Sequence, residues 1–118
     1  MSGVLAESEG RGDYRLLRNV TNRLGVLWER LSDPAIGYVP VDLSDWYCRF
    51  ELLSGEGVVW FSRDCDAHGS DGKAVVYIPP TAFTDAVWSG RRSGSWRMTA
   101  SKDGTTELLG WGYWTLAN

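Results

Sequence analysis

The chain has 118 residues, of which 43% are hydrophobic and 23% charged, the size and balance of one soluble globular domain. Its formal net charge of −3, from 12 basic and 15 acidic residues, argues against nonspecific nucleic-acid binding. No apolar run approaches the ~20 residues that a membrane helix requires, so we expect no membrane segment.

Residues 1–12 are mostly small and polar, and they lack the basic start and the apolar stretch of a signal peptide. We interpret them as a flexible tail in front of a single domain over residues 13–118. Cys48 and Cys65 are the only cysteines, so they can form one bridge at most. Because no export signal precedes them, we expect two free thiols in a reducing compartment, the cytoplasm.

The segment Asp13–Ser32 is predicted to form a long N-terminal helix. Apolar residues recur in it at spacings of three and four, namely Leu17, Val20, Leu24, Leu27, Trp28 and Leu31. Asp13 is suitable as the N-cap, and Asp33 followed by Pro34 is a stop signal. Gly25 in the middle costs about 1 kcal/mol relative to Ala and weakens the helical pattern.

The rest of the chain is predicted to be mainly strand. The five segments with strand character are Trp46–Leu53, Gly57–Arg63, Lys73–Ile78, Ser95–Ser101 and Glu107–Leu116. A short helix from Thr81 to Trp88, ended by Gly90, is predicted between the third and the fourth strand. The expected fold is therefore α+β, with the long helix packed on a mainly antiparallel five-stranded sheet.

Seven tryptophans and the alternation of side chains along each strand predict two different sheet faces. The row expected in the core is Trp46, Cys48, Phe50, Leu52, Val58, Trp60, Val76, Ile78, Trp96, Met98, Trp114 and Leu116. The opposite rows combine arginines with aromatic rings, and the candidate binding residues there are Tyr47, Arg49, Glu51, Phe61, Arg63, Tyr77, Arg97, Trp111 and Tyr113. A bulge at Gly110 or Gly112 would exchange Trp111 and Trp114 between the faces.

This composition leads to the hypothesis of a small non-enzymatic binding protein, of the inhibitor or immunity type, that engages another protein. A solvated sheet face with cross-strand pairs has the same composition. A curled sheet would instead provide an aromatic-lined pocket for a small molecule or a carbohydrate. Nucleic acid is the less expected partner because the net charge is acidic, although a basic surface could be supplied by Arg49, Arg63, Arg91, Arg92 and Arg97.

An enzyme is the third hypothesis, and it depends on Glu51 or on the loop from Asp64 to His68. Asp64, Asp66 and Gly69 match the opening of a calcium loop, but Val75 stands where the bidentate Glu belongs. Cys65 and His68 are spaced for a nucleophile and a base, yet no oxyanion donors are indicated. We therefore expect no catalytic residue, no metal site and no cofactor, and a Glu51 that forms ion pairs.

Overall fold

The computed structural model describes residues 10–117, in which the regular structure is nearly all β-strand. The strands are β1 (Gly10–Arg11), β2 (Tyr14–Leu17), β3 (Asn22–Leu27), β4 (Glu29–Asp33), β5 (Gly37–Pro40), β6 (Tyr47–Leu53), β7 (Val59–Asp64), β8 (Ala67–His68), β9 (Lys73–Ile78), β10 (Ser93–Lys102) and β11 (Thr105–Ala117). The helical structure of this part of the chain is limited to the 3₁₀ helix η1, Ala86–Gly90.

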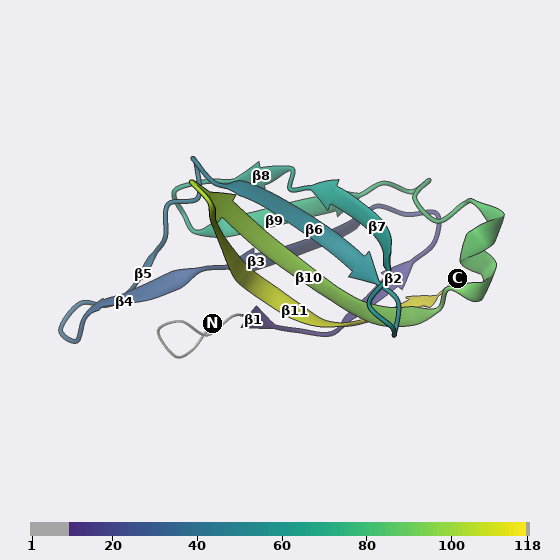
Figure 1. The fold of residues 1–118 in the computed structure, drawn as a ribbon, viewed down its shortest axis with the longest axis horizontal. Coiled ribbons are helices and arrows are strands. Elements are labelled where there is room, and N and C mark those ends of the chain that lie inside the picture. The colour runs from purple at the N-terminus through teal and green to yellow at the C-terminus, as the bar shows by residue number, and fades with distance from the viewer. Residues whose placement is uncertain (1–9, 118) are drawn as a thin grey trace.

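The strands form a large sheet, a small sheet and a separate hairpin (Figure 1). The large sheet has the order β1-β11-β10-β6-β7, and β2 also pairs with β11. β1 and β2 run parallel to β11, whereas the other pairs of this sheet are antiparallel. The small sheet has the antiparallel order β3-β9-β8. The β4–β5 hairpin extends away from both sheets and lengthens the molecule to 52 Å, against 26 and 23 Å in the other directions.

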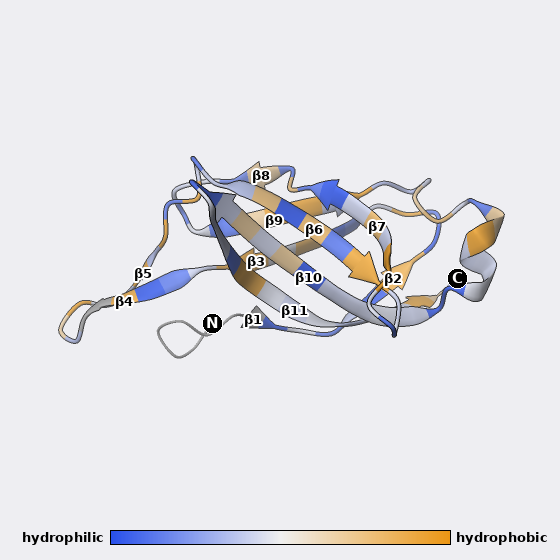
Figure 2. Ribbon diagram, viewed as in Figure 1, coloured by the Kyte–Doolittle hydropathy of each residue, from blue (hydrophilic) through white to orange (hydrophobic). Residues whose placement is uncertain are grey.

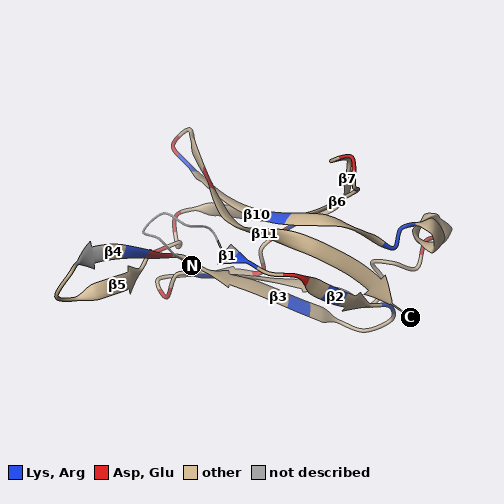
Figure 3. Ribbon diagram, turned by 90° about the horizontal axis from the view of Figure 1, so that it is seen from below, with Lys and Arg blue, Asp and Glu red and all other residues tan. Residues whose placement is uncertain are grey.

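The two sheets pack face to face over one core, and β10 and β3 lie in separate layers in Figure 3. The chain crosses between the sheets from β2 to β3, from β3 to β6, from β7 to β8 and from β9 to β10. This arrangement corresponds to the B-E-D and G-F-C-C′ strand order of immunoglobulin-like sandwiches. Because such sandwiches serve many unrelated functions, the topology alone implies no activity.

The predicted core row is largely confirmed, and apolar positions alternate with polar ones along β6 and β10 (Figure 2). The buried members are Cys48, Phe50, Leu52, Val76, Ile78, Trp96, Met98, Trp114 and Leu116. Trp46 and Trp60 are partly buried against this cluster. The assignment of Val58 to the core is wrong, because it lies in the turn before β7 and is 58% exposed.

Two buried tryptophans also serve as hydrogen-bond donors to the backbone. The indole N–H of Trp96 donates to Gly12 O at 2.8 Å, and that of Trp114 donates to Leu53 O at 3.1 Å. A Cβ atom on Gly112 would collide with Gly12 O and with Trp96 Nε1. The close approach of β11 to the segment between β1 and β2 therefore requires glycine at position 112.

The predicted long helix over Asp13–Ser32 is wrong, and the α+β class with it, because this segment forms β2, β3 and most of β4. The chain turns back at Asn19, whose φ of 63° does not occur inside a right-handed helix. Leu24 and Trp28 are buried as expected, but Leu27 and Leu31 of the supposed apolar stripe are exposed. Pairing of β3 with β9 stabilises the extended conformation over the helical one.

Asn22 holds the turn that replaces the centre of that helix. Its Oδ1 accepts a hydrogen bond from Leu17 N at 3.0 Å. Its Nδ2 donates to Leu17 O at 2.9 Å and to Val20 O at 3.4 Å. The buried amide thereby links the end of β2 to the start of β3 and satisfies both backbone groups of Leu17.

Two further expectations about helices and termini require correction. The predicted helix from Thr81 to Trp88 is a turn followed by the single 3₁₀ helix η1, with Asp85 as N-cap. Of the predicted tail, residues 1–9 lie outside the described residues, whereas Gly10–Arg11 form β1. No helix within residues 10–117 is long and apolar enough to cross a membrane.

Candidate functional site

The large sheet presents one row of side chains across four strands, on the side facing away from the small sheet. The ladder pairs Arg11 with Trp111, Trp111 with Arg97, and Arg97 with Glu51. Side chains of directly paired residues point to the same face of a sheet. We call this side the outer face, and its main residues are Arg11, Tyr47, Arg49, Glu51, Arg97, Leu108, Trp111 and Tyr113.

An aromatic and cationic cluster forms the β1–β11 end of the outer face. The Arg11 guanidinium lies 5.0 Å from the centroid of Trp111 and 5.5 Å from that of Tyr113, distances at which cation–π attraction operates. The two rings meet edge to face, with centroids 6.1 Å apart. Asp13 accepts hydrogen bonds from Tyr113 N at 3.1 Å and from Arg11 at 3.4 Å. The half-buried Trp111 ring therefore packs against both Arg11 and Tyr113.

Ion pairs between β6 and β10 order the middle of the face. Arg97 Nε donates to Glu51 Oε1 at 2.5 Å, and Arg49 Nε lies 3.9 Å from Glu51 Oε2. Both oxygens of this carboxylate thus face guanidinium groups, and its side chain is only 16% exposed. This geometry suits a structural ion pair better than the donation of a proton to a substrate.

A second network continues the face toward β7. Arg49 donates to the Tyr47 hydroxyl at 3.0 Å, to Asp64 at 3.3 Å and to Ser62 Oγ at 2.7 Å. The Tyr47 hydroxyl in turn donates to Asp64 Oδ1 at 2.6 Å. Half of the Tyr47 side chain is exposed, so the ring offers contact area to a partner while its hydroxyl is fixed.

A shallow depression of about 550 Å³ lies on this face between β6, β10 and β11. Its lining combines apolar, hydroxyl and charged groups from Glu51, Leu53, Ser95, Trp96, Arg97, Thr99, Thr106, Leu108 and Trp111. Leu108 reaches it because a bulge in β11 leaves Leu109 unpaired between the Leu108–Thr99 and Gly110–Met98 pairs. Leu109, whose position in the alternation predicts the outer face, is buried instead, and Trp111 stays on the outer face.

The structure brings together six of the nine predicted binding residues: Tyr47, Arg49, Glu51, Arg97, Trp111 and Tyr113. The other three lie elsewhere. A bulge at Trp60 sets Phe61 opposite Leu52, on the core side, where its ring packs 6.2 Å from that of Phe83. Tyr77 belongs to the small sheet and stacks with Arg23.

Arg63, the third of these, pairs with Phe50 on the core side of β7. Its side chain reaches beyond the sheet edge to Asp66, with an N–O distance of 2.8 Å.

Arg11 and Asp13, which complete the outer face, could not be inferred from the sequence. They belong to a polar segment with no periodicity, and it is the pairing with β11, about 100 residues away, that places them.

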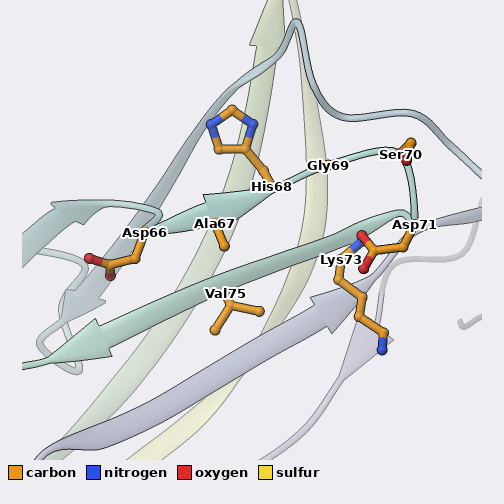
Figure 4. A pocket seen from close by; sticks show the side chains of 8 residues that line it. All are labelled: Asp66, Ala67, His68, Gly69, Ser70, Asp71, Lys73 and Val75. Carbon is orange, nitrogen blue, oxygen red and sulfur yellow. The ribbon is translucent and has the colours of Figure 1, made fainter.

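The loop after β7 lines another depression, of about 560 Å³, at β8 and the start of β9 (Figure 4). His68 Nδ1 lies 2.9 Å from Leu43 O, and because a carbonyl can only accept, Nδ1 carries the hydrogen. Asp71 accepts a hydrogen bond from Lys73 N. Asp66 accepts hydrogen bonds from Arg63 and from Tyr77 N, and the Arg63 bond is the main cause that lowers the pKa of this carboxyl.

The polar side chains of the loop are thus engaged by backbone groups and, in the case of Asp66, by Arg63. Burial, followed by the nearby Cys48, Asp66 and Asp64, raises the pKa of the Cys65 thiol to about 12, so the thiolate needed for nucleophilic attack is scarce. Among residues 10–117, no three His, Cys, Asp or Glu side chains are grouped closely enough to hold a metal ion. Comparisons with protein-family models and with curated proteins gave no match.

Proposed function

We propose that this chain is a small non-enzymatic binding protein that engages another protein through the outer face of its large sheet. The observation that carries the proposal is the preordered cluster of Arg11, Trp111 and Tyr113 beside the depression lined by Leu108 and Arg97. Tyr, Trp and Arg are the residues that dominate binding energy in protein interfaces. Rings that are already fixed lose little conformational entropy when a partner binds.

The charge balance of the face favours a protein over a nucleic acid. Each of its three arginines has a carboxylate neighbour, in the pairs Arg11–Asp13, Arg49–Asp64 and Arg97–Glu51. Phosphate binding requires cations whose charge is not already neutralised. A partner protein whose surface has mixed polarity and an apolar centre matches the outer face better. The target of an inhibitor or immunity-type protein is expected to present such a surface.

Site-specific photo-crosslinking in cells that produce the chain tests this proposal. A benzophenone amino acid replaces Tyr113 on the outer face in one variant and Tyr77, exposed on the small sheet, in the control. We expect one protein to be cross-linked from position 113 but not from position 77, and the product to be lost on Arg97→Ala. Equal products from both positions, or none from position 113, would refute the proposal.

Folding of the variants has to be measured in the same experiment. Arg97 is exposed and Trp111 is half-buried, so Arg97→Ala and Trp111→Ala are expected to keep the cooperative unfolding of the original chain. Loss of the fold in both variants would assign these residues a structural role instead. The test therefore separates a binding face from a merely solvated one.

The depression itself favours a second candidate function, the binding of a small molecule or a carbohydrate. Its volume of about 550 Å³ lies in the range of ligand pockets, and Trp111 forms part of its wall. Titration with a panel of oligosaccharides, followed by tryptophan fluorescence, tests this candidate. A saturable shift that is absent in Trp111→Phe supports it, and an unchanged spectrum across the panel rejects it.

A cytoplasmic location belongs to the same proposal. Cys48 and Cys65 are unbridged, as expected in a reducing compartment. Fractionation of cells with an antibody against the chain measures the location directly. Recovery with periplasmic or secreted proteins would contradict the proposal.

A further inference from the structure

Cys48 and Cys65 face one another across two neighbouring strands. Cys48 lies in β6, and Cys65 follows the last residue of β7. The N–H of Cys65 donates to Cys48 O at 2.9 Å, directly beyond the Arg49–Asp64 pair of the ladder. Residues opposite each other in an antiparallel ladder direct their side chains to the same face. Here that face is the inner one, because Cys48 is fully buried and Cys65 packs against the core.

We propose that Cys48 and Cys65 form a cross-linking site that closes into an intramolecular disulfide when the chain folds in the presence of a low-molecular-weight disulfide. In a hydrogen-bonded antiparallel pair the two Cα atoms are about 5.5 Å apart. Disulfides join residues whose Cα atoms are separated by about 4.4–6.8 Å. The hydrogen bond from Cys65 N to Cys48 O continues the ladder by one position, and a pair in this position is expected to have a backbone spacing suitable for the bridge.

The reaction is two successive thiol–disulfide exchanges with a glutathione disulfide as the oxidant. In the first, the Cys65 thiolate attacks one sulfur of the oxidant, so that a mixed disulfide forms and one glutathione thiolate leaves. In the second, the Cys48 thiolate attacks Cys65 Sγ and displaces the other glutathione. Two cysteine thiols are oxidised by two electrons, one disulfide is reduced, and both cysteine protons end on glutathione.

The same burial that places the thiols together makes them slow to react once the chain has folded. Burial raises the pKa of Cys48 to about 11 and contributes most to the raised pKa of Cys65. A cysteine in the unfolded chain has a pKa of about 8.5 and therefore forms far more thiolate than either buried thiol of the folded chain. The bridge should accordingly form during folding, and a chain that is already folded should resist oxidation.

The cross-link would close the β6–β7 hairpin, a loop of about 18 residues, and would restrict mainly the unfolded chain. For a domain of this length, we expect the melting temperature to rise by roughly 8–16 °C. β6 also carries Arg49 and Glu51 of the outer face, so the bridge would tether the strand that holds part of it. The cross-link nevertheless does not depend on what that face binds.

The test refolds the full chain from urea in a glutathione redox buffer and incubates the folded, reduced chain in the same buffer. The expected product after refolding is a monomer lighter by two hydrogens, with a peptide that joins Cys48 to Cys65 and a higher melting temperature. Dithiothreitol should reverse both changes. The chain that was folded beforehand should keep both thiols over the same time.

The matched control is Cys65→Ser, whose half-buried side chain tolerates the hydroxyl. It should refold without a bridge and acquire at most one glutathione. Peptide mapping of the unmodified chain needs no variant, so it decides the matter even if Cys65→Ser does not fold. Refolding that yields only mixed adducts or intermolecular dimers, or a bridged chain that melts below the reduced one, would overturn the proposal.

Discussion

Replacing Asn22 with Leu should destabilise the turn between β2 and β3 while keeping the number and branching of the side-chain heavy atoms. The side chain is 9% exposed, and its amide makes three hydrogen bonds to the backbone of Leu17 and Val20. Leucine has no polar atoms, so it would leave both the N–H and the C=O of Leu17 without these partners. The loss therefore combines missing hydrogen bonds with the desolvation of two backbone groups.

The magnitude follows from those bonds. Each contributes about 0.5–1.5 kcal/mol net, and an unsatisfied buried group costs about 1–3 kcal/mol. We therefore expect Asn22→Leu to lower the free energy of unfolding by about 2–4 kcal/mol. With about 2.1 cal/mol/K of unfolding entropy per residue, a chain of this length has about 0.25 kcal/mol/K, so a loss of 3 kcal/mol lowers the melting temperature by about 12 °C.

Urea titration and calorimetry of the two proteins measure this loss. The matched control is Asn19→Gly in the same turn, where glycine adopts the positive φ without strain. Its free energy of unfolding should change by less than about 1 kcal/mol. A loss in Asn22→Leu no larger than in Asn19→Gly would show that the amide does not hold the turn.

Three further perturbations have defined outcomes. In Gly112→Ala, the added Cβ should push the Gly12 segment away from Trp96. The Gly12 amide, which donates to Trp111 O, should then lose its protection from hydrogen exchange. Unchanged protection would disprove this packing argument. The pKa of Asp66 is lower in the folded chain than its unfolded value of about 3.9. Its carboxylate therefore stabilises the fold at pH values above about 3.9, and this contribution is lost as the pH falls through the folded pKa. The stability difference between the original chain and Asp66→Asn, measured in urea, should thus shrink between pH 5 and pH 2, and a constant difference would contradict the assignment. A double-mutant cycle on Glu51 and Arg97 should give a coupling of about 0.5–1 kcal/mol that falls in 1 M salt, and no coupling at low salt would rule out their ion pair.

The positions of β6, β7, β9, β10 and β11 could be predicted because apolar and polar residues alternate over most of each strand, whereas the two-residue β8 lies in a segment predicted to be a polar loop. In β10, Trp96 and Met98 are buried while Arg97 between them is exposed, and such a pattern needs no knowledge of neighbouring strands. The N-terminal segment cannot be predicted from its own residues in this way. Leu24 and Trp28 fit both a helical and an extended pattern, and pairing with β9 decides between them.

The outer face was predictable where the alternation was regular and not where a bulge interrupted it. Arg49, Glu51 and Arg97 share the face because β6 and β10 pair without a shift. Phe61 does not join them, because the bulge at Trp60 turns it toward the core. An extra residue in a strand reverses every later side chain, and no local feature of this segment marks where it falls.

The parallel pairing of β1 and β2 with β11 delays the completion of the fold during synthesis. Tyr14 and Leu17 are made about 100 residues before their partners Trp114 and Ala117. On a ribosome, β1 and β2 must therefore wait until β11 has been synthesised before they can join the sheet. Leu16 consequently reaches its buried position only after its partner Leu116 in β11 has been synthesised.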